Sequence, residues 1–469
     1  MIRRTKIVAT LGPATAAPDR IARLLDAGAN VIRINASHGT PELRAQWFQM
    51  VREVAAGRDQ AIGILVDLQG PRIRVGELKQ PRELVPGKEV VLAPEDVAQG
   101  DDLPTTYEDL AKDARVGAKI LLNDGLFSLE VTKIDPPRVT ARVIDGGELT
   151  SHKGMNLPGL TVSAPALTVK DKEDVKAAVE LGADYLALSF VRRAEDLKTL
   201  RALVPQGMKL VAKIEKSAAL DDLERILTAS DALMVARGDL GVELPFETVP
   251  LVQKHLIKEA NRHGKPVITA TQMLESMVHA PRPTRAEASD VANAILDGTD
   301  AVMLSAETAT GDYPEEAVAA MDRIIREMER SPARGRDERR ADARPNGGSV
   351  RVEDAIALGT AAVARMLSTP LIVTLTQGGF TARKVSACRP PVPILAVTPI
   401  QQTWRQLSLV WGVLPVHVTQ VPGYDAMLEV VRDLILKRGF AQPGERIVMT
   451  AGLPWEVSGS TNLIKVEEV

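Results

Sequence analysis

Two apolar runs in the second half of the chain each end in a group of polar side chains that could carry chemistry. The runs cover Pro266–Ala270 and Ala301–Leu304, and hydroxyl, amide and carboxyl groups follow closely after both. A buried strand has no structural need for such groups at its exit, whereas a barrel of alternating strands and helices carries its catalytic groups at the carboxyl ends of its strands. The polar residues at these two exits are Thr271, Gln272, Glu275, Ser305, Glu307 and Thr308.

The same pattern follows five other apolar runs. One such exit means little, because an Arg or Glu near a strand end is more often solvated or salt-bridged than functional. Polar groups at the same pole of so many strands are difficult to explain by chance. The residues at these exits are Arg33, Asn35, Ser37 and His38, then Asp67 and Arg74, then Ser189 and Phe190, then Lys213 and Glu215, and then Arg237, Gly238 and Asp239.

The types of these residues suit phosphoryl chemistry assisted by a divalent cation. Glu215 and Asp239 offer hard carboxylate oxygens of the kind that Mg²⁺ prefers. Lys213 and Arg33 are cations that can neutralise the charge of a transferring phosphoryl group. Gly238 would let backbone N–H groups approach a carboxylate or a phosphate, although an ordinary turn explains this glycine equally well.

Eight short apolar runs alternate with amphipathic helical patterns, which predicts a (β/α)8 barrel of the TIM type. After the third run the helical period disappears until about Pro165, and strand-like alternation with turn signals such as Asn123-Asp124-Gly125 replaces it. We interpret this stretch as a small β-barrel inserted at the top of the main barrel, where it could close over the site as a lid. The eight predicted strands are Lys6–Thr10, Val31–Ile34, Ile62–Val66, Tyr185–Leu188, Lys209–Ala212, Ala232–Val235, Val267–Ala270 and Ala301–Leu304.

The predicted fold class is therefore α/β, with three parts. Residues 1–71 and 166–330 are expected to form the barrel, and residues 72–165 the inserted lid. Residues 331–350 are highly charged, carry Pro and Gly and lack an apolar period, which is typical of a linker. Residues 351–469 alternate helices and strands again and predict an open parallel sheet, whose ligand crevice would lie beyond the carboxyl ends of its strands.

Composition limits the possible partners. In 469 residues, 58 Lys and Arg are balanced by 61 Asp and Glu, so there is no general attraction to nucleic acid or to an anionic membrane. No apolar stretch approaches the roughly 18 residues of a membrane helix, and the apolar run Ile7–Leu11 is too short for a signal peptide. The single cysteine, Cys388, excludes an intrachain disulfide, and the histidines lack paired ligand spacing, which favours an oxygen-bound cation. We expect a cytoplasmic protein without nucleic-acid or membrane partners.

The motifs around these residues resemble those of pyruvate kinase over nearly the whole chain. That family is built as a barrel, an inserted β lid and a C-terminal regulatory domain, which is the layout that the patterns predict. The resemblance implies Mg²⁺-dependent transfer of a phosphoryl group from phosphoenolpyruvate to ADP, giving pyruvate and ATP in the last step of glycolysis. The resembling segments are TKIVATLGPAT, VIRINASHGT, VDLQGPRIRVG, HKGMNLPG, VAKIEK, LMVARGDLGVE and the long, specific stretch Lys265–Tyr313.

The resemblance also implies roles for individual residues. Glu215 and Asp239 would bind the Mg²⁺, or Mn²⁺, that coordinates phosphoenolpyruvate. Lys213 would stabilise the transferring phosphoryl group while Arg33 holds it. The residues implied to receive the substrate carboxylate region are Gly238, Asp239 and Thr271.

Protonation and nucleotide binding are implied in the same way. Enolpyruvate would be protonated by a water relay that includes Thr271, Ser305 and Glu307. The nucleotide would lie between the barrel and the lid, from which a lysine reaches down. The residues implied to contact it are Asn35, His38, Arg74 and Lys153.

Arg72 departs from the family's pattern, because many members carry Glu at this position, a residue tied to their need for a monovalent cation. In those members K⁺ lies among groups equivalent to Asn35, Ser37, Asp67 and the backbone of Leu68. A guanidinium here supplies fixed positive charge near that site, which predicts an enzyme without a K⁺ requirement, like the potassium-independent bacterial members. The alternative is that Arg72 points to solvent and the K⁺ site is intact.

A loop in the C-terminal part resembles the family's effector-phosphate loop but lacks its usual middle Ser. The resemblance implies a homotetramer and a phosphosugar or nucleoside-monophosphate effector, without implying fructose 1,6-bisphosphate in particular. The other interpretation of this loop is a plain turn between a strand and a helix. The loop residues are Thr376, Gln377, Gly378, Gly379 and Thr381.

Two other functions fit part of the pattern. A Mg²⁺-dependent barrel lyase that acts through a pyruvate enolate would share the two carboxylates and a cation, but it has no use for Lys153 on a lid or for His38 and Arg74. A non-catalytic metabolite sensor on an inactive barrel is opposed by the complete set of catalytic groups, since drift would spoil at least one of them. An assay of pyruvate formation with and without ADP separates the three functions.

Overall fold

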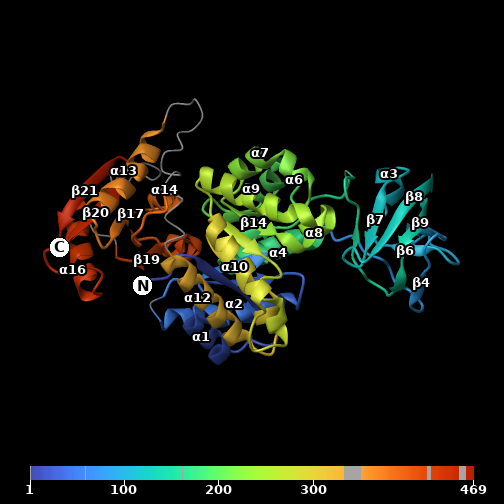
Figure 1. Ribbon diagram of the computed structural model, residues 1–469, viewed down its shortest axis with the longest axis horizontal. Coiled ribbons are helices and arrows are strands. Elements are labelled where there is room, and N and C mark those ends of the chain that lie inside the picture. Colours follow the sequence, from blue (N-terminus) through green and yellow to red (C-terminus); the bar gives the residue numbers. More distant parts are fainter. Residues whose placement is uncertain (1, 59, 161, 332–349, 420–423, 454–460) are drawn as a thin grey trace.

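The computed structural model (Figure 1) describes residues 2–469 except 59, 161, 332–349, 420–423 and 454–460. A part made mainly of β-strands lies at one end of the longest axis, a barrel in the middle, and an α/β part formed by the C-terminal segment at the other end (Figure 1). Nearly all of the predicted linker, residues 331–350, falls outside the described residues. The domain boundaries expected at residues 71, 165 and 330 stay predictions.

Eight parallel strands form a closed barrel in which successive barrel strands are neighbours in space. Seven of the eight are almost entirely buried along their length. Continuous burial explains why these strands read in the sequence as unbroken apolar runs. Each predicted strand coincides with an observed one, three of them with identical bounds and the others within two residues, so the predicted TIM-type barrel is confirmed. The strands are β1 (Lys6–Leu11), β2 (Val31–Asn35), β3 (Gly63–Asp67), β12 (Tyr185–Leu188), β13 (Lys209–Ile214), β14 (Ala232–Ala236), β15 (Val267–Ala270) and β16 (Ala301–Leu304).

Helices follow the barrel strands and cover the outside of the barrel (Figure 1). Helix α10 (Arg285–Asp297) illustrates why they begin and end where they do. The Thr284 hydroxyl accepts a hydrogen bond from Glu287 N at 3.2 Å, the Glu287 carboxylate accepts one from Thr284 N at 2.7 Å, and Gly298 ends the helix with φ 97°. The other barrel helices are α1 (Pro18–Ala27), α2 (Pro41–Ala56), α4 (Val169–Glu180), α5 (Ala194–Arg201), α6 (Ala218–Asp221), α7 (Leu223–Ala229), α8 (Arg237–Glu243), η1 (Phe246–Thr248), α9 (Val249–Arg262), η2 (Glu275–Val278), α11 (Ala306–Ala309) and α12 (Pro314–Arg330).

The insertion after β3 contains strands and one short helix around a core of its own. Strands β11-β7-β8-β9-β5-β6 form a six-stranded sheet, and β10 pairs with β4 in a second, two-stranded sheet. The predicted turn at Asn123-Asp124-Gly125 joins β7 to β8, and all three residues have positive φ. Its elements are β4 (Arg82–Leu84), β5 (Glu89–Pro94), β6 (Leu103–Thr105), α3 (Leu110–Asp113), β7 (Lys119–Leu122), β8 (Phe127–Asp135), β9 (Arg138–Asp145), β10 (Gly147–Leu149) and β11 (Met155–Asn156).

The C-terminal part is a five-stranded sheet in the order β19-β18-β17-β20-β21, with helices packed against it. The first four strands are parallel, as the patterns predict, and β21 adds an antiparallel edge. No helix among the residues described has the length and apolar character needed to cross a membrane. The elements are α13 (Val352–Met366), β17 (Ile372–Leu375), α14 (Phe380–Ala387), β18 (Ile394–Thr398), α15 (Gln401–Gln406), η4 (Leu407–Leu409), β19 (Val413–His417), α16 (Tyr424–Lys437), β20 (Arg446–Ala451) and β21 (Leu463–Glu468).

The C-terminal part closes the amino-terminal end of the barrel. Leu409 is fully buried and belongs to the same apolar cluster as the inward-facing barrel side chains Val8 and Val211. The neighbouring Ser408 accepts a hydrogen bond from the backbone N–H of Gly63, the first residue of β3, at 3.0 Å. The two parts therefore share a hydrophobic core at the amino-terminal end of the barrel. The described residues of the C-terminal part do not cover the opposite end, where the carboxyl ends of the strands carry the predicted site residues.

Candidate active site

Asp67 is the centre of an ion-pair network at the carboxyl ends of β2, β3 and β13. Its Oδ2 lies 2.7 Å from Arg33 Nη2 and accepts a hydrogen bond from Arg33 Nε at 2.8 Å, while its Oδ1 lies 3.1 Å from Lys213 Nζ. Lys213 Nζ also lies 2.9 Å from Glu215 Oε1 and donates to Ser189 Oγ at 2.7 Å. The structure thus brings together residues from four of the predicted strand exits.

The charges of this network stabilise one another. Burial by itself would raise the pKa of Asp67, but Lys213 and Arg33 outweigh it and the pKa is lowered. Burial likewise disfavours the charged form of Lys213, yet Asp67 and Glu215 raise the pKa of this ammonium above its usual value. Lys213 is therefore a fixed positive charge at neutral pH, held in place by two carboxylates.

Glu215 and Asp239 form the predicted metal-binding pair. Glu215 is buried, and its Oε2 accepts a hydrogen bond from Phe190 N at 2.6 Å. Burial and the negative charge of Glu215 raise the pKa of Asp239 to about 6, which shows that the two carboxylates act on each other. Two hard oxygen donors that repel each other in a half-buried site fit a divalent cation such as Mg²⁺, because the cation would relieve that repulsion.

Thr271 and Gly238 meet at the exits of β14 and β15. Gly238, at the start of α8, donates its N–H to Thr271 Oγ1 at 2.8 Å, and this hydroxyl donates to the carbonyl of Ala270 at 2.6 Å. Thr271 has φ 68°, a left-handed conformation that is unusual for a β-branched residue, and Arg237 Nη2 holds its carbonyl at 2.7 Å. The chain is therefore strained where the substrate carboxylate is expected, which is typical of functional sites.

Ser305 and Glu307 lie after β16, where the carboxylate of Glu307 accepts hydrogen bonds from two backbone N–H groups. It is fully buried, and its two oxygens accept hydrogen bonds from Ser305 N at 2.6 Å and Leu274 N at 3.1 Å. Burial raises the pKa of Glu307. Within the described chain no direct hydrogen bond joins Glu307 to Thr271, so the relay predicted between them would need bridging water.

The residues predicted to contact nucleotide gather where the insertion leaves the barrel. Burial and the charges of Arg72, Arg33 and Arg74 lower the pKa of His38, so barrel and insertion residues share one positive environment. In the insertion, Arg74 pairs with Gly154, the neighbour of Lys153, across an isolated bridge, and Val75 N donates to the carbonyl of Lys153 at 2.8 Å. Asn35 lies on the barrel side at the end of β2.

Three of the four groups predicted to form a monovalent-cation site already have partners. Asn35 Oδ1 accepts a hydrogen bond from Ser37 N at 3.0 Å, and the Leu68 carbonyl accepts one from Ser189 Oγ at 2.7 Å. Both oxygens of Asp67 face cations, as described above. Arg72 is exposed, and its charge lowers the pKa values of both Asp239 and His38, which places its guanidinium within electrostatic reach of the site.

Two residues close to the network are absent from the predicted set. Arg33 Nη1 donates to Thr10 Oγ1 at 3.1 Å, and Thr10 lies near the end of β1, where the strand-exit rule could have found it. Lys216 Nζ lies 5.6 Å from the centre of the Phe190 ring and 2.5 Å from Glu243 Oε1. Its place beside the site has no signal in the sequence, because a lysine after a strand is usually solvated.

The loop predicted to bind an effector leads from β17 into α14. Gly379 has φ 75°, and Thr381 lies in the first turn of α14, where its hydroxyl is 2.8 Å from that of Thr461. Gly378 accepts a hydrogen bond from Arg383 Nη1 at 3.1 Å. The position beyond the carboxyl end of a central strand is the one expected for a ligand crevice in an open sheet.

Two family models match the chain. The model described as pyruvate kinase, barrel domain, matches residues 2–318, and the model described as pyruvate kinase, alpha/beta domain, matches residues 354–467. Together they account for the barrel with its insertion and for the C-terminal sheet. The predicted (β/α)8 barrel and the predicted C-terminal α/β part are both confirmed.

Curated relatives and a solved structure agree with these models. The chain is 45% identical over 479 aligned residues to pyruvate kinase 2 of Synechocystis sp., an alignment that covers 100% of this chain and 79% of the relative. It is 44% identical over 477 residues to pyruvate kinase of Geobacillus stearothermophilus, covering 100% of this chain and 81% of the relative. The crystal structure of a pyruvate kinase from Cryptosporidium parvum superposes with a TM-score of 0.94 at 34% identity, over 99% of this chain and 96% of that one. The chain belongs to the pyruvate kinase family of phosphotransferases.

Proposed function

We propose that the network around Asp67 transfers the phosphoryl group of phosphoenolpyruvate to ADP. One observation carries the proposal: Lys213 Nζ is held 3.1 Å from Asp67 and 2.9 Å from Glu215, with Arg33 on the other oxygen of Asp67. Two cations are thus fixed before substrate arrives. Phosphoryl transfer through a loose transition state needs positioning and charge neutralisation far more than covalent help, so preorganised cations are the main requirement.

In this proposal Lys213 stabilises the charge of the transferring group and Arg33 holds the phosphate. Asp67 takes no part in bond making and orients both cations. Because the carboxylates of Asp67 and Glu215 raise the pKa of Lys213, the ammonium keeps its proton and acts by charge alone.

Glu215 and Asp239 would hold Mg²⁺, or Mn²⁺, beside Lys213. Their carboxylate oxygens and the electrostatic strain between them support this assignment. When bound, the cation would supply charge neutralisation for the substrate oxygens. The backbone N–H of Gly238, Asp239 itself and the hydroxyl of Thr271 would receive the carboxylate of the substrate.

Protonation of the enolpyruvate product would begin at Thr271. The Thr271 hydroxyl is held by Gly238 N and the Ala270 carbonyl, so its position is defined. Ser305 and Glu307 would supply the proton through water, and the raised pKa of Glu307 supports its part in that relay.

ADP would lie between Asn35 and His38 on the barrel and Arg74 and Lys153 on the insertion. The positive environment around His38 supports binding of a polyphosphate there. The insertion would close over the nucleotide as a lid.

K⁺ is not required in this proposal. Asn35, Asp67 and the Leu68 carbonyl are engaged within the protein, and Arg72 supplies positive charge near the site. Members of the family with Glu at position 72 lack that charge, which explains why they would need a cation that this chain does not.

A phosphosugar or a nucleoside monophosphate is proposed as effector at the loop Thr376–Thr381. Buried hydroxyls near it support recognition of a polar ligand: Thr381 pairs with Thr461, and the Thr374 and Thr450 hydroxyls on the adjacent strands have no partner within the described chain. The loop lies in the C-terminal part, away from the Asp67 network.

We also infer a homotetramer in the cytoplasm. Exposed apolar side chains on two helical segments support contacts between copies, since such groups are costly in water: Phe246 in η1 is 82% exposed, Leu251 in α9 is 69% exposed, and Met366 at the end of α13 is 83% exposed. The N-terminal apolar run supports the cytoplasmic location, because it forms the buried barrel strand β1.

The test is pyruvate formation from phosphoenolpyruvate with Mg²⁺, measured in the presence and absence of ADP. The proposal predicts pyruvate and an equal amount of ATP only when ADP is present. Pyruvate formed at the same rate without ADP would indicate a phosphatase or a lyase, and no turnover at all would indicate a non-catalytic sensor.

A further inference from the structure

Four cations surround a single carboxylate at the opposite pole of the barrel from the active site. Arg201 ends α5, Lys209 opens β13, and Lys265 lies just before β15. Arg383, on α14 of the C-terminal part, acts electrostatically on Lys209 and Lys265 across the junction of the two parts. The carboxylate is that of Asp231, which directly precedes β14.

Asp231 pairs directly with two of these cations, Arg201 and Lys209. Its Oδ2 accepts hydrogen bonds from Arg201 Nη2 at 2.5 Å and from Leu210 N at 2.9 Å. Its Oδ1 lies 3.5 Å from Lys209 Nζ. Lys265 and Arg383 are affected by the charge of Asp231, but within the described residues neither forms a direct ion pair with it.

Lys265 and Arg383 each have one backbone acceptor. Lys265 Nζ donates to the Ser230 carbonyl at 2.6 Å, and Arg383 Nη1 donates to the Gly378 carbonyl at 3.1 Å. In the ranges that the structure describes, neither side chain forms an ion pair with a carboxylate. A guanidinium carries five N–H donors, so one carbonyl satisfies only a small part of the hydrogen-bonding capacity of Arg383.

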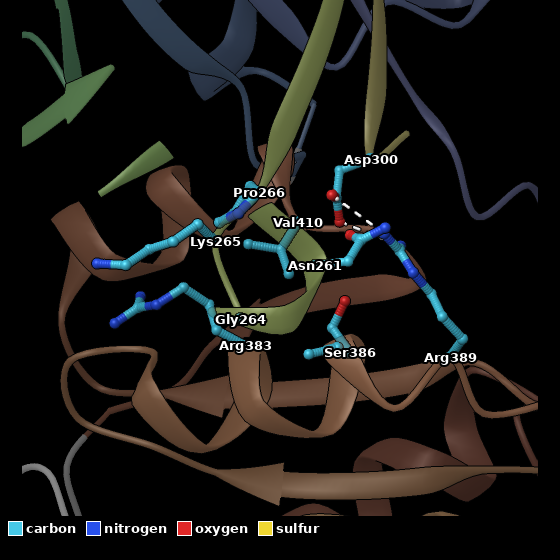
Figure 2. Close-up of a pocket in the computed structure, with 10 residues that line it drawn as sticks. Asn261, Gly264, Lys265, Pro266, Asp300, Arg383, Ser386, Arg389 and Val410 are labelled. Carbon is cyan, nitrogen blue, oxygen red and sulfur yellow. Dashed lines mark hydrogen bonds and ion pairs between the residues drawn. The ribbon is translucent and has the colours of Figure 1, made fainter. Parts of the chain in front are cut away.

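The two side chains border a hollow between the barrel and α14 (Figure 2). The hollow is shallow and open to solvent. Figure 2 shows the side chains of Lys265 and Arg383 running side by side, with their charged ends on the same side of the hollow. On the far side Arg389 is neutralised by Asp300, with both of its terminal nitrogens 3.1 Å from the carboxylate.

The cluster carries more positive charge than its own groups can balance. Burial lowers the pKa of Lys209, and the charge of Arg383 lowers it further. Burial also lowers the pKa of Lys265; Asp231 opposes this, while Arg383, Lys209 and Arg201 add to it. Like charges held together away from water repel strongly, and an added anion would remove that repulsion.

We propose that this junction binds a small oxyanion of the phosphate class, held by Lys265, Arg383 and Lys209. A tetrahedral oxyanion offers several acceptors at once, which match the fork of a guanidinium and the point charges of two ammonium groups. The site is separate from the Asp67 network, which lies at the other pole. Arg383 also donates to Gly378, so an anion here would act on the same loop that is proposed to bind the effector.

The experiment measures the rise in unfolding temperature with inorganic phosphate, at constant ionic strength set with chloride. Wild type, Lys265→Gln, Arg383→Gln and Lys133→Gln are compared. Lys133→Gln is the matched control, because it removes one positive charge from an exposed lysine of the insertion, at the other end of the molecule (Figure 1). We expect the apparent Kd for phosphate to increase at least tenfold in the first two variants and to stay unchanged in the control.

Lys213→Met separates this site from the active site. A phosphate response that persists in Lys213→Met supports the junction site, and one that disappears there assigns the response to the active site and overturns the proposal. An undiminished response in both Lys265→Gln and Arg383→Gln also overturns it. If Arg383→Gln does not fold, the apparent Kd values for phosphate of Lys265→Gln and Lys209→Gln are compared with that of wild type.

Two further experiments identify the chemical class of the ligand and locate it in the structure. Glycerol 3-phosphate binding more tightly than inorganic phosphate assigns the site to phosphate monoesters, and the reverse assigns it to the free ion; both results support an oxyanion site. Crystals soaked in selenate would show an anomalous peak between Lys265 and Arg383 in wild type and none in Lys265→Gln. The absence of that peak in wild type would contradict the proposal.

Discussion

Asp67 shows how much of the proposed chemistry depends on single charges. Its carboxylate is buried, yet it stays ionised because Lys213 and Arg33 lie on its two oxygens. Removing either cation would leave the buried carboxylate with a single cation, which costs more than losing an exposed ion pair. Substitutions in this network should therefore change catalysis and positioning together.

Arg72 is the residue on which K⁺ independence depends. We expect wild type to have nearly equal activity in tetramethylammonium buffer with and without KCl at matched ionic strength. Arg72→Glu changes the local charge by two units and should create a K⁺ activation of about tenfold or more. Arg82→Glu, which makes the same change on β4 of the insertion, is the control. Strong K⁺ activation of the wild-type enzyme would refute this account.

Thr271 is the residue from which protonation is expected to start. Thr271→Ala should slow the exchange of pyruvate methyl hydrogens with solvent deuterium by about a hundredfold, the usual size of a lost general-acid contribution. Exchange is followed by NMR in the presence of Mg²⁺. Thr310→Ala, a change at an exposed threonine after the short helix α11, serves as the control. Equal exchange rates in wild type and Thr271→Ala would remove Thr271 from the relay.

The insertion is the element expected to move. It leaves the barrel after β3 and returns before α4, and it has a hydrophobic core of its own, so it can hinge as a unit. Lys153→Ala should raise the KM for ADP by about tenfold while leaving phosphoenolpyruvate binding nearly unchanged. Lys133→Ala, at a 70% exposed lysine on β8, is the matched control. Unchanged nucleotide kinetics in Lys153→Ala would mean that the lid has another purpose.

Elements with a regular burial pattern were predictable from the sequence, and elements without one were not. The eight barrel strands were found because continuous burial leaves unbroken apolar runs. Strand β21 was missed because it is an edge strand whose side chains are half-buried or exposed, such as Lys465 and Glu467. Its sequence therefore carries no burial pattern.

The candidate site was predictable to a similar extent. The strand-exit rule placed Arg33, Asp67, Lys213 and Glu215 at one pole, where they meet. It could not show that Asp67 pairs with both cations, because side-chain pairing depends on distances across three strands. It also could not show that Glu307 is held by backbone N–H groups, which depends on the fold of the chain after β15.

At the scale of the whole molecule, the barrel and the C-terminal part behave as one packed unit. Leu409 enters the barrel core, and Arg389 and Asp300 pair across the same junction. Lys6, in β1, is 4% exposed and donates Nζ to the Val413 carbonyl of the C-terminal part at 2.7 Å. The stability of this junction should thus be sensitive to the protonation of a single lysine.

Burial, with the charge of Arg3 adding to it and Glu329 opposing it, lowers the pKa of Lys6 from 10.5 to about 7. Between these values the unfolded chain binds more protons than the folded one, so the free energy of unfolding should rise with pH from about 7 to about 10, by at most about 1.4 kcal/mol per unit. Below pH 7 both states are protonated and this dependence vanishes. Denaturant titrations of wild type, Lys6→Met and the exposed Lys437→Met measure it. The same pH slope in wild type and Lys6→Met would contradict the assignment.

The most direct test of the central claim is the steady-state turnover of Lys213→Met in saturating Mg²⁺, with Lys176→Met, at an 80% exposed lysine of α4, as control. Methionine keeps the apolar stem of the side chain and removes the ammonium group with its contacts to Asp67, Glu215 and Ser189. Circular dichroism checks that the variant is folded before its turnover is compared. If Lys213 neutralises the transferring phosphoryl group, kcat/KM should fall about a thousandfold, equivalent to about 4 kcal/mol of transition-state stabilisation, while the control keeps its activity. Turnover of Lys213→Met close to that of wild type would contradict the account.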